Sequence, residues 1–258
     1  MIGTGTISLG RRASLRRLGM EPVARPGARA LTTENRERPR SIDVACQTPG
    51  QLDGALQEAL VVCHARILAA LAGQERLTIA TCSAVAGEGK TTVALALAEM
   101  LARDFPRQTL LVDGCLRSPR LHSLFAMRSA PGMTECLTTG TMHLEAVRWS
   151  GTHWLMTSGQ PLTGGENVGW EEERNLLHML KQMFRVTVVD LPATLPNAQD
   201  VATIATSIDR LVWVVEANST PAGKVLEAMQ IAGRDKVLGV VLNKSRPALP
   251  GWLRRLSE

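Results

Sequence analysis

Two short segments of the chain combine residue types that could hold phosphate and a metal ion. The segment SAVAGEGKTT at residues 83–92 is a glycine-rich turn that ends in Lys90 and Thr91, and the segment LLVDGCL at residues 110–116 is an apolar run with a carboxylate, Asp113. Glycines let backbone N–H groups point at phosphate oxygens, and the start of a following helix adds partial positive charge. The two segments therefore predict a phosphate-binding loop followed, one helix later, by an acid on the metal side.

The first segment fits the P-loop pattern, because it follows an apolar strand and precedes a helix. Ala84 replaces the first glycine of that pattern. In such a loop Lys90 would reach the β- and γ-phosphates, and the Thr91 hydroxyl would bind Mg²⁺. The residues predicted to bind the nucleotide here are Ala86, Gly87, Glu88, Gly89, Lys90, Thr91 and Thr92.

A second carboxylate, Asp190, ends the apolar run VTVVD before Leu191 and Pro192. Ligands of open parallel sheets bind at the carboxyl ends of the strands, where both Asp113 and Asp190 are expected. There an acid can hold the metal-bound water or orient the attacking nucleophile. We predict Lys90, Asp113 and Asp190 as catalytic residues, Thr91, Asp113 and Asp190 as metal-side residues, and ATP with Mg²⁺ as the ligands.

Apolar runs alternate with helical patterns from residue 51 to residue 242. The expected strands are 77–82, 109–112, 154–157, 186–189, 211–215 and 237–242, and the expected helices are 51–72, 91–102, 171–183, 199–207 and 221–232. Residues 118–153 are irregular and are expected to form a helical excursion, and residues 247–258 a terminal helix turn. Strands rich in β-branched residues and separated by helices predict an α/β fold, with a mostly parallel sheet covered by helices on both faces.

The positive charge is concentrated near the start of the chain. Residues 1–40 hold nine Arg and three Glu, a net +6, so the other 218 residues carry −1 of the total +5. We expect two parts: a basic, largely disordered arm over residues 1–50 and a nucleotide-binding domain over residues 51–258. The arm could meet anionic lipid, nucleic acid or an acidic partner, or remain a solvated arm.

The cysteines favour a reducing compartment. They are five in number, at positions 46, 63, 82, 115 and 136, with no CxxC pair, which excludes the usual zinc spacings and argues against a disulfide framework. With no long apolar run, the chain is not expected to cross a membrane by itself. A cytoplasmic location is therefore expected.

The ordered motifs resemble those of partitioning-type P-loop ATPases and, within them, the bacterial tyrosine kinases of capsule and exopolysaccharide assembly. The motifs, over roughly residues 55–244, are GEGKT at 87–91, LLVDGCLRSPRLHSLF at 110–125, PGMTECLTTG at 131–140, VVDLP at 188–192, Asp200, and GVVLNK at 239–244. Partitioning ATPases usually carry a second lysine early in the loop, where this chain has Val85, and this favours the kinase branch.

The resemblance implies further roles and a function. Arg117 lies in the second acid motif and is counted with the nucleotide-binding residues, and Asn243 would touch the adenine edge. The chain would bind and hydrolyse ATP and regulate a membrane-bound polysaccharide chain-length or export protein at the inner face of the membrane. Any transfer of phosphate would be to another protein, and the chain could associate with itself.

Three departures keep alternatives open. Cys115 stands where the family usually has an acid, the chain has no Tyr to autophosphorylate, and the ring-forming Glu-Arg-Arg pattern is not recognisable around 58–66. A thiol is a poor ligand for Mg²⁺, which prefers oxygen. One alternative is a catalytically degenerate nucleotide-binding adaptor. Another is a partitioning or positioning ATPase that binds DNA or membrane through the basic arm, although nucleic acid is not the partner we favour.

Overall fold

The computed structural model describes residues 41–42, 54–140, 142–148, 152–163 and 169–245. The predicted arm lies outside these residues except for Ser41–Ile42, and the terminal turn expected over 247–258 lies outside them entirely. The division into an arm and a nucleotide-binding domain therefore stays a prediction. Among the described residues, no helix is both long enough and apolar enough to cross a membrane.

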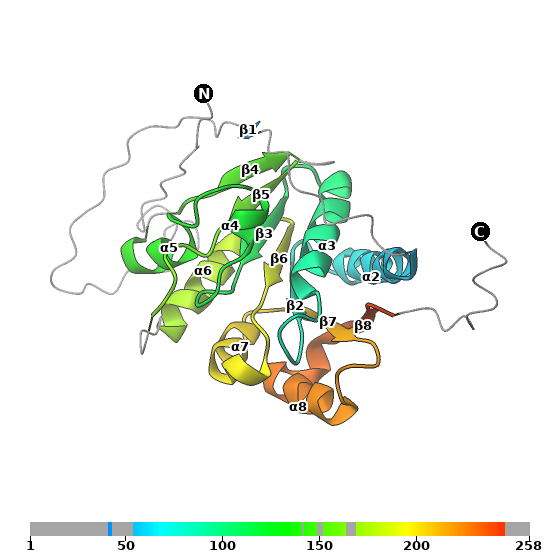
Figure 1. The fold of residues 1–258 in the computed structure, drawn as a ribbon. Helices are drawn as coiled ribbons and strands as arrows, with labels where there is room; N and C mark the ends of the chain where they lie inside the picture. The colour runs from blue at the N-terminus through cyan, green and yellow to red at the C-terminus, as the bar shows by residue number, and fades with distance from the viewer. Residues whose placement is uncertain (1–40, 43–53, 141, 149–151, 164–168, 246–258) are drawn as a thin grey trace.

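One sheet of eight strands forms the middle of the molecule (Figure 1). Its strands are β1 (Ser41–Ile42), β2 (Leu77–Cys82), β3 (Thr109–Asp113), β4 (Glu145–Arg148), β5 (Thr152–Met156), β6 (Val186–Asp190), β7 (Arg210–Glu216) and β8 (Val237–Asn243), in the spatial order β1-β4-β5-β3-β6-β2-β7-β8. The six strands from β5 to β8 in this order run parallel, as the sequence predicted.

Helices cover both faces of this sheet. The helices are α2 (Gly54–Ala72), α3 (Lys90–Asp104), α4 (Leu121–Leu124), α5 (Met133–Thr139), α6 (Trp170–Met183), α7 (Ala198–Ala205) and α8 (Ala222–Ala232). Short 3₁₀ turns at Leu195–Asn197 and Arg234–Lys236 complete the described elements. In Figure 1, α2 and α3 lie on one side of the sheet, whereas α5, α6, α7 and α8 lie on the other.

Alternation of side chains along the strands divides the core into two layers. On β3, Leu110 and Val112 face the layer with α5 to α8, whereas Leu111 faces the layer with α2, α3 and α4. Successive side chains of a strand point to opposite faces, so a strand that is apolar at every position must be covered on both sides. The predicted α/β architecture with helices on both faces is confirmed, and its strands end along one edge.

The segment 118–153 differs from the expected helical excursion. It contains the helices α4 and α5, but it also contains the strand β4, which pairs antiparallel with β5. The four residues EAVR of β4 are too few to show a period of two, and their pairing with β5 rather than their own pattern defines them as a strand. The strand β1 then pairs in parallel with β4 at the edge of the sheet.

Candidate nucleotide site

The glycine-rich loop links the end of β2 to the start of α3. Gly87 and Gly89 have φ angles of 88° and 94°, a left-handed conformation that side chains with a Cβ rarely adopt. A Cβ on Gly87 would meet nothing within 4 Å, so the backbone there faces open space. Lys90, the first residue of α3, is half-buried. The loop therefore has the backbone shape and the helix start that suit an anion.

The side chain of Glu88 holds this loop in place from inside the protein. The residue is only 1% exposed. One carboxylate oxygen accepts a hydrogen bond from the Val85 backbone N–H at 2.9 Å. The other accepts from the Glu216 N–H at 3.1 Å and from the Thr220 hydroxyl at 2.6 Å. Glu88 was predicted to contribute to nucleotide binding, and its side chain ties the loop to the end of β7.

Asn243 also packs against the loop. Its side-chain N–H₂ donates to the Glu88 carbonyl at 2.8 Å, and its Oδ1 accepts from the Lys244 backbone N–H at 2.9 Å. A Cβ on Gly89 would collide with the Asn243 amide nitrogen, so a larger residue there would displace the Asn243 side chain. Both polar atoms of Asn243 are thus engaged with the protein, and the predicted contact with adenine stays a prediction.

Asp190 and Thr91 meet beside the loop. The Thr91 hydroxyl donates to Asp190 Oδ2 at 2.6 Å, and the Thr81 hydroxyl donates to Oδ1 at 3.2 Å. Burial raises the pKa of Asp190 to about 6, although the hydrogen bond from Thr91 and the positive charge of Lys90 act in the opposite direction. The structure therefore brings Lys90, Thr91 and Asp190 together, and the oxygens of Thr91 and Asp190 are of the kind that Mg²⁺ prefers.

Asp113 lies directly across from Asp190 in the register of β3 and β6, but its carboxylate turns to its own loop. Oδ1 accepts from the Cys115 N–H at 3.1 Å, and Oδ2 accepts from the N–H groups of Arg120 and Leu121 at 3.1 and 3.0 Å. Burial raises the pKa of Asp113, while these three hydrogen bonds lower it. Asp113 orders residues 114–121, and a direct part in catalysis stays a prediction.

Cys115 is buried two residues after the end of β3. Its thiol contacts the Asp190 carbonyl oxygen at 3.8 Å, and the Ser158 hydroxyl donates to the Cys115 carbonyl at 3.3 Å. Burial, together with the negative charges of Asp190 and Asp113, raises the pKa of the thiol. At neutral pH the side chain is therefore a neutral thiol and offers no carboxylate oxygen to this edge of the sheet.

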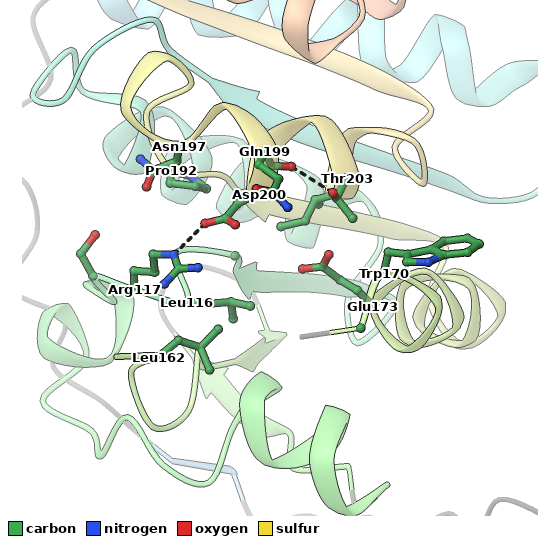
Figure 2. A pocket seen from close by; sticks show the side chains of 14 residues that line it. Leu116, Arg117, Leu162, Trp170, Glu173, Pro192, Asn197, Gln199, Asp200 and Thr203 are labelled. Atoms are coloured by element: carbon green, nitrogen blue, oxygen red, sulfur yellow. Dashed lines mark hydrogen bonds and ion pairs between the residues drawn. The ribbon is translucent and has the colours of Figure 1, made fainter. Parts of the chain in front are cut away.

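Arg117 pairs with a residue of α7. Its Nε donates to Asp200 Oδ2 at 3.0 Å, and Figure 2 shows this ion pair on the wall of a cavity. The predicted nucleotide contact of Arg117 stays a prediction. Of the other predicted binding residues, Ala86 is exposed and Thr92 is half-buried.

Sequence reasoning missed three contributors to the site. Thr81 could have been noticed as a polar residue in the apolar strand LTIATC, whose side chains are all buried. Thr220 and Glu216 support the loop only because β7 is the neighbour of β2, and no local pattern indicates this. Among the described residues, no cluster of three or more His, Cys, Asp or Glu side chains could hold a metal ion by itself.

The parallel sheet, the glycine-rich loop and the acids at the neighbouring strand ends define a P-loop nucleoside triphosphatase fold of the partitioning-ATPase type. MinD of Pyrococcus horikoshii, solved as a complex with Mg-ADP, has this fold and superimposes with a TM-score of 0.53 at 19% identity, over 70% of this chain and 76% of MinD. The kinase domain of the tyrosine kinase ETK of Escherichia coli superimposes with a TM-score of 0.66 at 22% identity, over 85% of this chain and 88% of that domain.

Curated relatives carry the comparison to a particular family. The succinoglycan biosynthesis transport protein ExoP of Rhizobium meliloti is 31% identical over 183 residues, which are 68% of this chain and 23% of ExoP. The tyrosine-protein kinase YwqD of Bacillus subtilis is 29% identical over 167 residues, which are 62% of this chain and 69% of YwqD. No protein-family model matches the chain. The resemblance indicated by the motifs is confirmed: the chain is a relative of bacterial tyrosine kinases of exopolysaccharide biosynthesis.

The chain spans only about a quarter of the length of ExoP, and about two thirds of YwqD. The matching part of ExoP is therefore one portion of a much longer protein. What the longer relatives do as whole proteins bears on this chain only as a proposal.

Proposed function

We propose that this protein binds Mg·ATP at the loop 83–92, hydrolyses it slowly, and regulates a membrane-bound protein that controls the length or export of a polysaccharide. Any phosphate transfer goes to another protein, because the chain has no Tyr to modify. The observation that carries the proposal is the 2.6 Å hydrogen bond between Thr91 and Asp190, made at the start of a helix that follows two left-handed glycines.

Each residue would have a distinct part. The backbone N–H groups of residues 87–91 would bind phosphate oxygens, with Lys90 adding a positive charge. Thr91 and Asp190 would hold Mg²⁺, which supplies neutralisation of the phosphate charge. Asp113 would keep residues 114–121 in place beside the reacting phosphate through its three backbone hydrogen bonds.

Substitution of Lys90 tests nucleotide binding. In titrations with a fluorescent ATP analogue and magnesium, Lys90→Met should weaken binding by at least about tenfold, the effect of losing one charge-assisted contact. Arg103→Met is the matched control, since it removes a positive charge from the same helix about 20 Å away. Equal binding by the parent and Lys90→Met, or no binding by the parent, would end the proposal.

A second candidate is a nucleotide-binding adaptor that does not turn ATP over. The buried, neutral thiol of Cys115 favours it, because this position supplies no acid near Asp190. Such an adaptor would use ATP only to stabilise a surface that docks its partner.

Turnover by the parent and by Cys115→Asp separates the two candidates. For the adaptor, we expect no magnesium-dependent phosphate release from the parent and measurable release from Cys115→Asp. Release by the parent that is lost in Lys90→Met favours the ATPase instead. Cys136→Asp is the matched control, because it places the same acid at another buried cysteine, on α5.

A further inference from the structure

A cavity of about 320 Å³ lies beside the predicted nucleotide site, between the loop after β3, the start of α6, and α7. Figure 2 shows residues that line it, and six carry the argument: Leu116, Arg117, Leu162, Glu173, Asp200 and Ile204. Ligand pockets in proteins usually measure about 300–1,000 Å³, so this cavity is at the lower limit and suits a small group. It meets the predicted site at Gly114 and Pro192, which follow the two strand-end acids, and at Arg117.

Glu173 is the unusual residue of this cavity. It is 6% exposed, and its carboxylate receives no hydrogen bond or ion pair from any residue that the structure describes. Its backbone N–H donates to the Gly169 carbonyl as part of α6, but this leaves the side chain without a donor. A buried carboxylate is costly to ionise unless it is paired, so a cation that enters the cavity would gain by pairing with Glu173.

The charged side chains that line the cavity favour the binding of one cation. Among the described lining residues, Arg117 is paired with Asp200 at 3.0 Å, and Glu173 in its ionised form is the other charged side chain. Apolar side chains of Leu116, Leu162 and Ile204 line the same space. A guest with one positive end and an apolar stem would match both features, and long basic side chains have this composition.

We propose that the cavity binds the side chain of a lysine or arginine from a protein partner, with its charged end at Glu173. The exposed residues Gly169 and Trp170 also line the cavity, so it reaches the surface where a partner can approach. The inference goes beyond the proposed function, because none of its steps requires a nucleotide. It gives the partner a chemical feature: a basic residue presented to the groove between α6 and α7.

Titration with blocked amino acids tests the inference. N-acetyl-arginine N-methylamide and its lysine counterpart are added to the full chain, and the backbone amide signals of Leu116 and Thr203 are followed by NMR. The citrulline compound is the matched probe, because it has the shape of arginine without the charge. We expect saturable shifts with arginine or lysine, and binding about tenfold weaker with citrulline.

Variants decide whether Glu173 is responsible. Glu173→Gln should bind the arginine and citrulline compounds equally, whereas Glu171→Gln, an exposed residue on the same turn of α6, should behave as the parent. Thr203→Lys provides a second route, since its tethered ammonium would fill the cavity, block the arginine compound and raise Tm. An intact preference for arginine in Glu173→Gln or unchanged binding in Thr203→Lys would overturn the proposal.

Two further outcomes count against it. Equal binding of arginine and citrulline by the parent would show that charge is not recognised. Binding of the free diamine putrescine without binding of either blocked amino acid would assign the cavity to small amines rather than to a partner's side chain. Loss of ATP binding in Lys90→Met would leave the result unaffected, so the two proposals can fail separately.

Discussion

Two buried glutamates, Glu88 in the glycine-rich loop and Glu173 in the neighbouring cavity, show how differently the same side chain can be used. Glu88 is 1% exposed and accepts hydrogen bonds from Val85, Glu216 and Thr220. Glu173 is 6% exposed and receives none from the described residues, and burial followed by the negative charge of Asp200 raises its pKa to about 7.

The difference indicates that Glu88 supports the fold, whereas Glu173 is available to a bound cation. A carboxylate whose acceptor sites are all used stabilises the loop that contains it, because breaking any one of its bonds leaves a buried charge short of a partner. A carboxylate without donors destabilises the free protein and gains on meeting a cation. The two residues should therefore respond to the same substitution with opposite signs.

The largest effect is expected for Glu88→Gln. Glutamine keeps one acceptor oxygen but places an N–H₂ group against backbone N–H donors, so we expect the free energy of unfolding to fall by about 3 kcal/mol. Urea denaturation measures this change. Glu227→Gln, an exposed residue of α8, should stay within about 0.5 kcal/mol of the parent. A similar small change for Glu88→Gln would mean that the loop does not depend on its carboxylate.

The sequence predicted where the loop and the strand-end acid lie, but it did not predict the hydrogen bonds that distant residues make to Glu88. The glycines around Glu88 follow one largely apolar strand and Asp190 ends another, so their position at one edge of the sheet followed from pattern alone. Two of the three donors to Glu88, the Glu216 N–H and the Thr220 hydroxyl, come from 128 and 132 positions away, and they were not predictable because the order of the strands was unknown.

The same limit explains the other departures. The motif around Arg117 led us to predict a contact with the nucleotide. In the structure its Nε donates a hydrogen bond to Asp200, 83 positions away. Glu173 sits among three consecutive glutamates at the start of α6, where acids favour the helix dipole whether or not they are buried. Only the packing of α6 against α7 and the loop after β3 singles it out.

The next largest effect is expected for Glu173→Gln, and it should depend on pH. The folded-state pKa of about 7 lies above the ordinary 4.5, so the folded protein holds this proton more tightly than the unfolded chain. The stability from Glu173 is therefore fully present below pH 4.5 and is lost as pH rises to about 7. Glutamine does not ionise, so the variant should be about 2 kcal/mol more stable than the parent at pH 8.

Thermal unfolding at pH 4 and pH 8 measures this difference. The parent and Glu173→Gln should unfold at nearly the same temperature at pH 4, and Glu171→Gln should follow the parent at both values. A gap between the parent and Glu173→Gln that is the same at pH 4 and pH 8 would show that the carboxylate is not held in an unfavourable ionised state.

Asp113→Asn should have the smallest effect on stability and sharpens the comparison, because this acid lies between the two extremes. Its three donors favour the charged form, while its complete burial opposes it, so we expect the free energy of unfolding to fall by only about 1 kcal/mol.

Asparagine has one acceptor oxygen and cannot serve both the Cys115 N–H on one side and the Arg120 and Leu121 N–H groups on the other. Hydrogen exchange should therefore accelerate on at least one side, while the Val85 amide, held by Glu88, keeps its protection. Unchanged protection at all three amides would show that Asp113 does not order this loop, and would favour a direct role of its carboxylate at the reacting phosphate.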